Sequence, residues 1–178
     1  MKLLKKIMDE KEISRMLRRL CSEVLERSDG AEDLALLGIQ TRGVYIAERM
    51  KNLIREVEGI DVPIGKLDIT LYRDDTALKL GKAIVKETEI PFDINEKRII
   101  LVDDVIFTGR TARAALDEIM DFGRPKCIWL LTLLDRGHRE LPIEPNFLGK
   151  KVPTTSKEWL FVKMREYDDE DGVYIEER

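Results

Sequence analysis

Residues 99–116 read IILVDDVIFTGRTARAAL. The apolar run 99–102 is typical of a strand that is buried in a parallel sheet. It delivers two adjacent carboxylates, Asp103 and Asp104, to the carboxyl end of that strand. In open α/β sheets, ligands bind at this end of the strands. The stretch therefore predicts an α/β fold with a polar site directly after the strand.

The loop 105–110 leads into a predicted helix over about 111–122, and the start of this helix is a candidate phosphate site. Free amide groups and the helix dipole both favour an anion there. Gly109 lets the backbone approach a ligand, and Thr108 and Thr111 add hydroxyl donors. The two aspartates would repel a phosphate, so they need a ribose diol, Mg²⁺ or a sugar cation as partner. A solvated turn or a helix cap would use the same aspartates, but the complete strand–loop–helix series favours the ligand site.

The rest of the chain alternates strands and helices, which predicts one mostly parallel sheet flanked by helices. Residues 73–97 are polar and irregular, as is usual for functional or mobile loops. We expect residues 135–178 and the N-terminal segment to form a small cap over the site. The whole chain, residues 1–178, is expected to form a single domain. The other expected helices cover 12–27 and 44–56, and the other expected strands cover 34–39, 62–72, 127–134 and 159–164.

Composition limits the classes of function. The chain has 178 residues, of which 43% are hydrophobic, enough for one domain with a core. Its 35 acidic residues outnumber 31 Lys and Arg, giving a formal net charge of −4. A bulk polycation for non-specific nucleic-acid binding is therefore excluded, and an RNA partner would have to use a local basic patch.

Cys21 and Cys127 lack the spacing of a metal site or a redox pair, which favours buried free thiols. The sequence contains no apolar run of the roughly 18 residues that a membrane span needs. We therefore expect a cytoplasmic protein without a membrane partner.

Several motifs resemble those of the type I phosphoribosyltransferases. VDDVIFTGRT at 102–111 is similar to the signature that binds phosphoribosyl diphosphate (PRPP) in this family. GIQTRG at 38–43, ITLYRDD at 69–75, GRP at 123–125 and DRGHRELPI at 135–143 follow the family's order. The resemblance spans nearly the whole chain and is closest to the members that join uracil phosphoribosyltransferase activity to regulation of pyrimidine operons. It implies the type I phosphoribosyltransferase fold, with a mostly parallel central sheet and a small hood.

The resemblance also implies roles for individual residues. Asp103 and Asp104 would hold the ribose hydroxyls, residues 107–111 would wrap the 5′-phosphate, and Mg²⁺ would be carried by the diphosphate of PRPP without a metal site of the protein. The loop at 40–43, where the family often has a non-proline cis peptide, would bind the diphosphate, and the loop from Arg73 would close over the reaction. The implied catalytic residues are Asp103, Asp104, Arg42 and Arg73. The implied substrate-binding residues are Thr41, Arg42, Gly43, Asp103, Asp104, Val105, Ile106, Phe107, Thr108, Gly109, Arg110, Thr111, Arg136 and Leu160.

Phe107 bears on the choice of base. Purine phosphoribosyltransferases with a similar loop carry an aspartate at this position, and that acid interacts with the purine ring. Its absence favours a pyrimidine, so the expected reaction converts uracil and PRPP to UMP and diphosphate. One alternative is a phosphoribosyltransferase that acts on another base, orotate or a purine, and does not bind RNA. A second alternative is a nucleotide-sensing protein that binds RNA and retains only vestigial catalysis.

The resemblance further implies binding to the mRNA leader of a pyrimidine operon in response to UMP or UTP, and a homo-oligomer, either a dimer or a tetramer. Basic residues of the first helix and of the C-terminal third could together track the RNA backbone. A solvated helix face with scattered charges explains them equally well, because acidic residues are interspersed. The candidates for RNA binding are Arg15, Arg18, Arg19, Arg27, His138, Arg139, Lys150 and Lys151.

Overall fold

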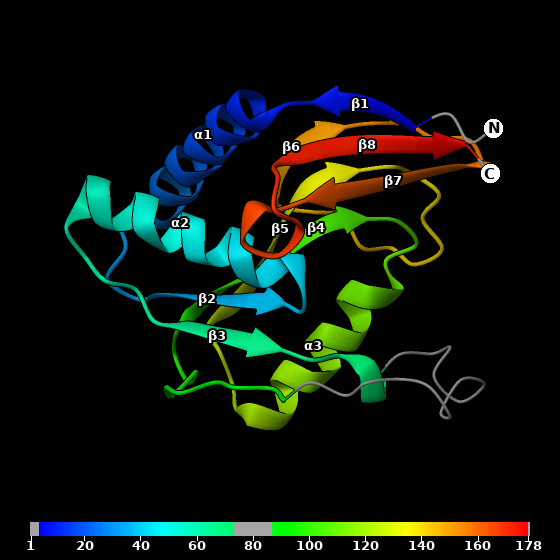
Figure 1. Ribbon diagram of the computed structural model, residues 1–178. Helices are drawn as coiled ribbons and strands as arrows, with labels where there is room; N and C mark the ends of the chain where they lie inside the picture. The colour runs from blue at the N-terminus through cyan, green and yellow to red at the C-terminus, as the bar shows by residue number, and fades with distance from the viewer. Residues whose placement is uncertain (1–3, 73–86, 178) are drawn as a thin grey trace.

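The computed structural model describes residues 4–72 and 87–177. Its centre is a five-stranded, fully parallel sheet in the order β3-β2-β4-β5-β6 (Figure 1). The middle strands β2, β4 and β5 each contain an apolar run whose side chains are buried, as both faces of the sheet are covered. The strands span Leu34–Ile39 (β2), Ile64–Leu67 (β3), Arg98–Ile106 (β4), Cys127–Asp135 (β5) and Phe147–Lys151 (β6).

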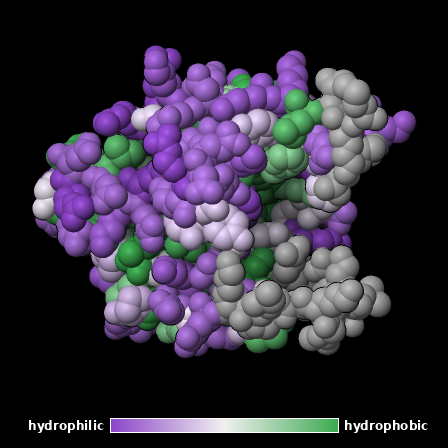
Figure 2. Space-filling model, viewed as in Figure 1, coloured by the Kyte–Doolittle hydropathy of each residue, from purple (hydrophilic) through white to green (hydrophobic). Residues whose placement is uncertain are grey.

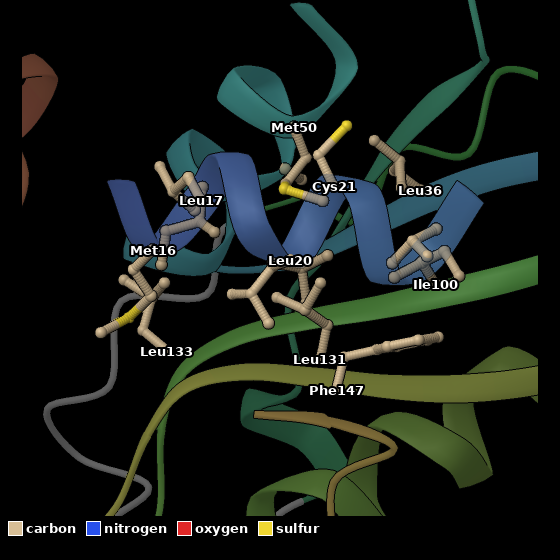
Figure 3. Packing of buried hydrophobic residues seen from close by; sticks show 14 of the residues in the cluster. Met16, Leu17, Leu20, Cys21, Leu36, Met50, Ile100, Leu131, Leu133 and Phe147 are labelled. Carbon is tan, nitrogen blue, oxygen red and sulfur yellow. The ribbon is translucent and has the colours of Figure 1, made fainter. Parts of the chain in front are cut away.

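Helices cover the two faces unequally. Helices α1 (Glu10–Ser28) and α2 (Arg42–Glu58) pack on one face, and α3 (Arg110–Phe122) packs on the other (Figure 1). The N-terminus of α1 is fixed by a capping box between Asp9 and Glu12. Figure 3 shows how the apolar stripe of α1 meets the sheet. The side chains labelled there are Met16, Leu17, Leu20 and Cys21 of α1, Met50 of α2, and Leu36, Ile100, Leu131, Leu133 and Phe147 of β2, β4, β5 and β6.

A smaller antiparallel sheet joins the two ends of the described chain. Its strands are β1 (Leu4–Met8), β8 (Gly172–Glu177) and β7 (Glu158–Lys163), in the order β1-β8-β7. The short helix α4 (Arg165–Asp168) connects β7 to β8 and lies beside α2 (Figure 1). β6 had been expected in the cap, but it belongs to the main sheet, because it pairs in parallel with β5.

Two strand predictions need correction. The segment 62–72 is not one strand: β3 ends at Leu67, and a 3₁₀ helix follows at Thr70–Tyr72. The Asp68 carboxylate causes this turn by accepting hydrogen bonds from the amide and the hydroxyl of Thr70. β4, in contrast, continues four residues beyond 102, because residues 103–106 still pair with β5. Asp103 and Asp104 therefore lie within the strand and not after it.

The predicted loop 73–97 is described only from residue 87, where it forms no helix or strand. Its residues 73–86, including Arg73, lie outside the described residues. From residue 87 the chain is held in place, since Glu89 and Lys66 exchange backbone hydrogen bonds of 2.9 and 2.8 Å. Thr88 additionally accepts a hydrogen bond from the Asp68 amide.

Hydrophilic residues cover most of the face shown in Figure 2, with smaller hydrophobic areas between them. Within residues 4–72 and 87–177, no helix has the length and apolar character that crossing a membrane requires. Both cysteines are free thiols; Cys21 is buried and Cys127 is half-buried.

Candidate active site

The first turn of α2 lies directly beside the part of β4 that carries the two aspartates. A Cβ atom on Gly43 would be 2.5 Å from the Val102 carbonyl oxygen and 3.3 Å from the Asp103 Cα atom. Only glycine permits so close an approach of the first turn of α2 to the strand. The peptide bond between Gln40 and Thr41 is cis, as the resemblance implies. The segment 40–43 and the aspartates, which are about 60 residues apart in the sequence, thus form one site.

The carboxylates of Asp103 and Asp104 are half-buried and partly satisfied by the backbone. Asp103 accepts from the Asp104 amide at 2.9 Å, and Asp104 accepts from the Val105 amide at 2.8 Å. Burial raises the pKa of Asp104, while hydrogen bonds from neighbouring groups and the positive charge of Arg42 oppose the rise. Asp104 and Arg42 therefore interact electrostatically across the site.

Arg42 itself has a second acidic partner. Its Nε and Nη2 atoms donate to the two carboxylate oxygens of Asp168 at 3.0 and 2.7 Å. The guanidinium carbon also lies 5.4 Å from the ring centre of Tyr167. Both partners belong to α4, so the C-terminal part of the chain reaches into the site.

The loop between β4 and α3 has the geometry expected of an anion site. Gly109 adopts the left-handed conformation, with φ at 92°, and precedes the first residue of α3. Arg110 donates its amide to the Thr108 hydroxyl at 3.2 Å. The first amide groups of a helix have no partner inside it, and the dipole adds positive potential at this end. A phosphate at the start of α3 would meet both.

Residues 139–141, which follow β5, hold this loop in place through hydrogen bonds. The amides of Glu140 and Leu141 donate to the Thr108 carbonyl at 2.9 and 3.1 Å, and Arg139 donates to the Phe107 carbonyl at 2.7 Å. Arg139 also pairs with Asp135 and Glu144. The loop 107–109 is therefore fixed independently of any ligand.

Arg136, the residue after β5, packs against the ring of Phe107. Its side chain is buried and donates to the Thr154 hydroxyl at 2.9 Å and to the Glu158 carbonyl at 2.7 Å. The guanidinium carbon lies 4.2 Å from the centre of the Phe107 ring, which is partly exposed. Leu160 is buried in β7, two residues beyond the Glu158 carbonyl.

The candidates for RNA binding fall into two groups. Arg19 of α1 comes together with the two lysines of β6, because it donates to the carbonyls of Leu148 and Gly149, and Lys150 and Lys151 follow on the same strand with exposed side chains. Arg15 is exposed on α1. The other candidates contact groups within the chain. Arg18 pairs with Glu56, and Arg27 stacks on Trp129 and Phe147. His138 contacts the Thr154 carbonyl, and Arg139 holds the loop 107–109, called the phosphate loop below.

Comparison with known proteins decides the family. The phosphoribosyl transferase domain model matches residues 4–163. The protein named "Bifunctional protein PyrR" from Listeria monocytogenes serotype 4b is 52% identical over 172 residues, covering 95% of this chain and 94% of that protein. The chain belongs to the PyrR family of phosphoribosyltransferases. PyrR proteins of Deinococcus deserti and Caldicellulosiruptor bescii are 52% and 51% identical and cover 95% and 97% of this chain, and 92% and 95% of their own lengths.

Solved structures agree on the fold that the PyrR family shares with other phosphoribosyltransferases. A hypoxanthine phosphoribosyltransferase from Staphylococcus aureus superposes with a TM-score of 0.67 at 18% identity, covering 95% of this chain and 90% of that one. A purine phosphoribosyltransferase from Pyrococcus horikoshii gives 0.61 at 21% identity, with coverages of 82% and 86%. The prediction of the type I phosphoribosyltransferase fold from the sequence is confirmed.

The structure brings most of the predicted substrate-binding residues of this PyrR family member to one end of the parallel sheet. They come from the start of α2 (residues 41–43), from the end of β4 and the start of α3 (residues 103–111), and from the residue after β5 (Arg136). Arg73 lies outside the described residues. Asp168 is a site residue that the sequence motifs did not predict. The acidic run 168–171 could have indicated a partner for a basic residue, but nothing in the sequence of that run points to Arg42.

Proposed function

We propose that this protein transfers the phosphoribosyl group of PRPP to uracil, forming UMP and diphosphate. The same protein would regulate a pyrimidine biosynthesis operon in the cytoplasm by binding its mRNA leader when a uridine nucleotide is bound. The observation that carries the proposal is the arrangement of Asp103 and Asp104 between Arg42 and the N-terminus of α3, in a chain about half identical to PyrR proteins.

The charges on either side of the reacting bond fit this transfer. As the bond from C1 of the ribose to the diphosphate breaks, positive charge develops on the sugar and negative charge on the leaving group. The carboxylates of Asp103 and Asp104 would accept hydrogen bonds from the ribose hydroxyls and stabilise the sugar cation. Arg42, at the start of α2, would bind the diphosphate, and the start of α3 would hold the 5′-phosphate.

Magnesium fits as an ion that arrives with the substrate. The described residues contain no group of three or more His, Cys, Asp or Glu side chains that could hold a metal. Mg²⁺ keeps several of its waters and is commonly bound through substrate phosphates and one or two carboxylates, and Asp103 and Asp104 provide such carboxylates. Once bound, it would neutralise negative charge on the diphosphate.

Phe107 and Arg136 support a pyrimidine as the base. The phosphate loop offers an aromatic ring where a carboxylate would serve a purine, and Arg136 behind it is directed to Thr154 and Glu158. Steady-state assays with uracil, orotate, hypoxanthine and guanine test this assignment. Turnover of a purine alone would eliminate uracil as the substrate.

The role of Asp104 has its own test. Asp104→Asn keeps the shape of the side chain and removes its charge, so we expect loss of transfer by a factor on the order of 10²–10³ without loss of the fold. Circular dichroism and the assay with uracil together check this. Near-normal turnover by the folded variant would contradict the role of that carboxylate.

The regulatory half of the proposal rests on the basic surface of α1 and β6 and on the PyrR relatives. Binding of leader RNA, measured with and without UMP, tests it against random RNA of the same length. Equal affinity for both RNAs would remove the regulatory function while leaving the enzyme intact. A dimer or tetramer is part of the proposal, and light scattering on the purified protein measures it.

A further inference from the structure

Helix α4 is joined to Arg42 by an ion pair through Asp168. Asp168 binds Arg42 with both carboxylate oxygens, at 3.0 Å to Nε and 2.7 Å to Nη2. Such a bidentate pair fixes the plane of the guanidinium as well as its distance. The side chain of Asp168 is only 13% exposed and that of Arg42 is 31% exposed, so water screens the pair weakly.

We propose that Asp168 is a positioning residue for the transferase reaction, which holds the Arg42 guanidinium in the orientation that binds diphosphate. The inference rests on the function proposed above. Asp168 would not touch the substrate and would act only through Arg42.

The number of donors on Arg42 allows this role. A guanidinium has five N–H groups. Asp168 takes the one on Nε and one of the two on Nη2, so three remain for an anionic ligand. Asp168 therefore leaves Arg42 able to bind diphosphate and reduces the rotamer freedom that a long side chain would lose on binding.

Asp168 is itself held from two directions. Its carboxylate accepts the Met164 amide at 2.8 Å, which fixes the side chain to its own turn. The turn is clamped to α2 by Arg49, which binds Glu166 and Asp171 at 2.7 Å each. The segment 164–171 therefore places Asp168 rigidly over the first turn of α2.

The same clamp supplies a matched control. Glu166 and Asp168 both lie on α4, and each binds an arginine of α2 with two oxygens. Glu166 binds Arg49, which lies on the same face of α2 as Arg42 but seven residues, or about two turns, further along the helix. Removing either charge should weaken the contact of α4 with α2, but only the change at Asp168 frees Arg42.

The experiment compares Asp168→Asn with Glu166→Gln in the full-length protein. We expect Asp168→Asn to raise KM for PRPP, and Kd for inorganic diphosphate with Mg²⁺, by about tenfold, the loss of roughly one charge-assisted bond. KM for uracil should change less than about twofold, and Glu166→Gln should leave all three constants within about twofold of the wild type. Asparagine keeps an oxygen for the Met164 amide; if it nevertheless unfolds the protein, Asp168→Ser is measured instead with the same expectation.

A double-mutant cycle separates positioning from a direct contact. In an Arg42→Ala background, Asp168→Asn should have no further effect on diphosphate binding. Equal effects of the Asp168 and Glu166 variants, or full additivity with Arg42→Ala, would overturn the inference while the wild type still binds PRPP. Failure of the wild type to bind PRPP would overturn the proposed function as well.

Discussion

The guanidinium carbon of Arg136 lies 4.2 Å from the centre of the Phe107 ring, and the Arg136 amide donates to the Ile106 carbonyl at 3.2 Å. The end of β4 at Ile106 and the residue after β5, Arg136, which are 30 residues apart, are thereby joined by two contacts. Burial lowers the pKa of Arg136, although arginine stays charged, so the ring faces a poorly hydrated cation. This stack connects the phosphate loop to the region where the base is proposed to bind.

Phe107→Leu should weaken binding of uracil, because leucine fills space but cannot hold the Arg136 cation over a ring. The lost interaction is worth about 1 kcal/mol, which corresponds to a rise of about fivefold in KM for uracil. KM for PRPP should stay within about twofold. Phe161→Leu, a change at an aromatic pair in the small sheet, is the control and should leave both constants unchanged. An unchanged KM for uracil in Phe107→Leu would show that the stack does not serve the base site.

Gly43→Ala tests the close approach of α2 to β4. The new methyl group would meet the Val102 carbonyl at 2.5 Å, so the first turn of α2 must move away from Asp103. We expect a loss of about 1–3 kcal/mol in the free energy of unfolding, measured in urea, and a higher KM for PRPP. Gly59→Ala is the control: its backbone is left-handed, with φ at 70°, but nothing lies within 4 Å of the added carbon. It should cost about 1 kcal/mol of stability and leave KM unchanged.

Sequence patterns predicted the core of this fold because β2, β4 and β5 each contain a long apolar run, and β2 and β4 are each followed by a helix. They also singled out the two aspartates and the loop 107–111 as a candidate site, since these residues lie together in one motif. The length of β4 could not be predicted, because the backbone pairing with β5 decides it. Contacts between charges far apart in the sequence were equally hidden, since Arg42 and Asp168 are 126 residues apart.

Glu118 makes stability depend on pH. It is 4% exposed, its Oε1 accepts from the Thr88 hydroxyl, and its Oε2 has no hydrogen-bond partner within residues 4–72 and 87–177. Burial raises its pKa, and the charges of Asp68 and Asp121 add to the rise. Since the folded pKa lies above the unfolded value, ionised Glu118 destabilises the fold at neutral pH, and this penalty disappears as pH falls below the unfolded pKa.

Glu118→Gln should therefore stabilise the protein at pH 7 by about 1 kcal/mol, the order of the cost of one unsatisfied buried group. The gain should vanish near pH 4, about the ordinary pKa of a glutamate. Thermal melts of both proteins across this range measure the difference. Asp117→Asn, on the same helix and 52% exposed in its pair with Arg113, is the control and should change the melting temperature little at any pH. A gain that persists at low pH would contradict the linkage.

Lys150 and Lys151 are the best candidates for contacts with RNA phosphates, because both are exposed on β6 next to the basic face of α1. Replacing both by alanine should lower the affinity for leader RNA and reduce the slope of log K against log salt by about 1.5–2, one phosphate contact for each lysine. Uracil transfer should persist, as neither side chain belongs to the proposed active site. Lys126→Ala, which removes a 52% exposed lysine near the start of β5, is the control. An unchanged salt slope in the double variant would place the RNA on another surface.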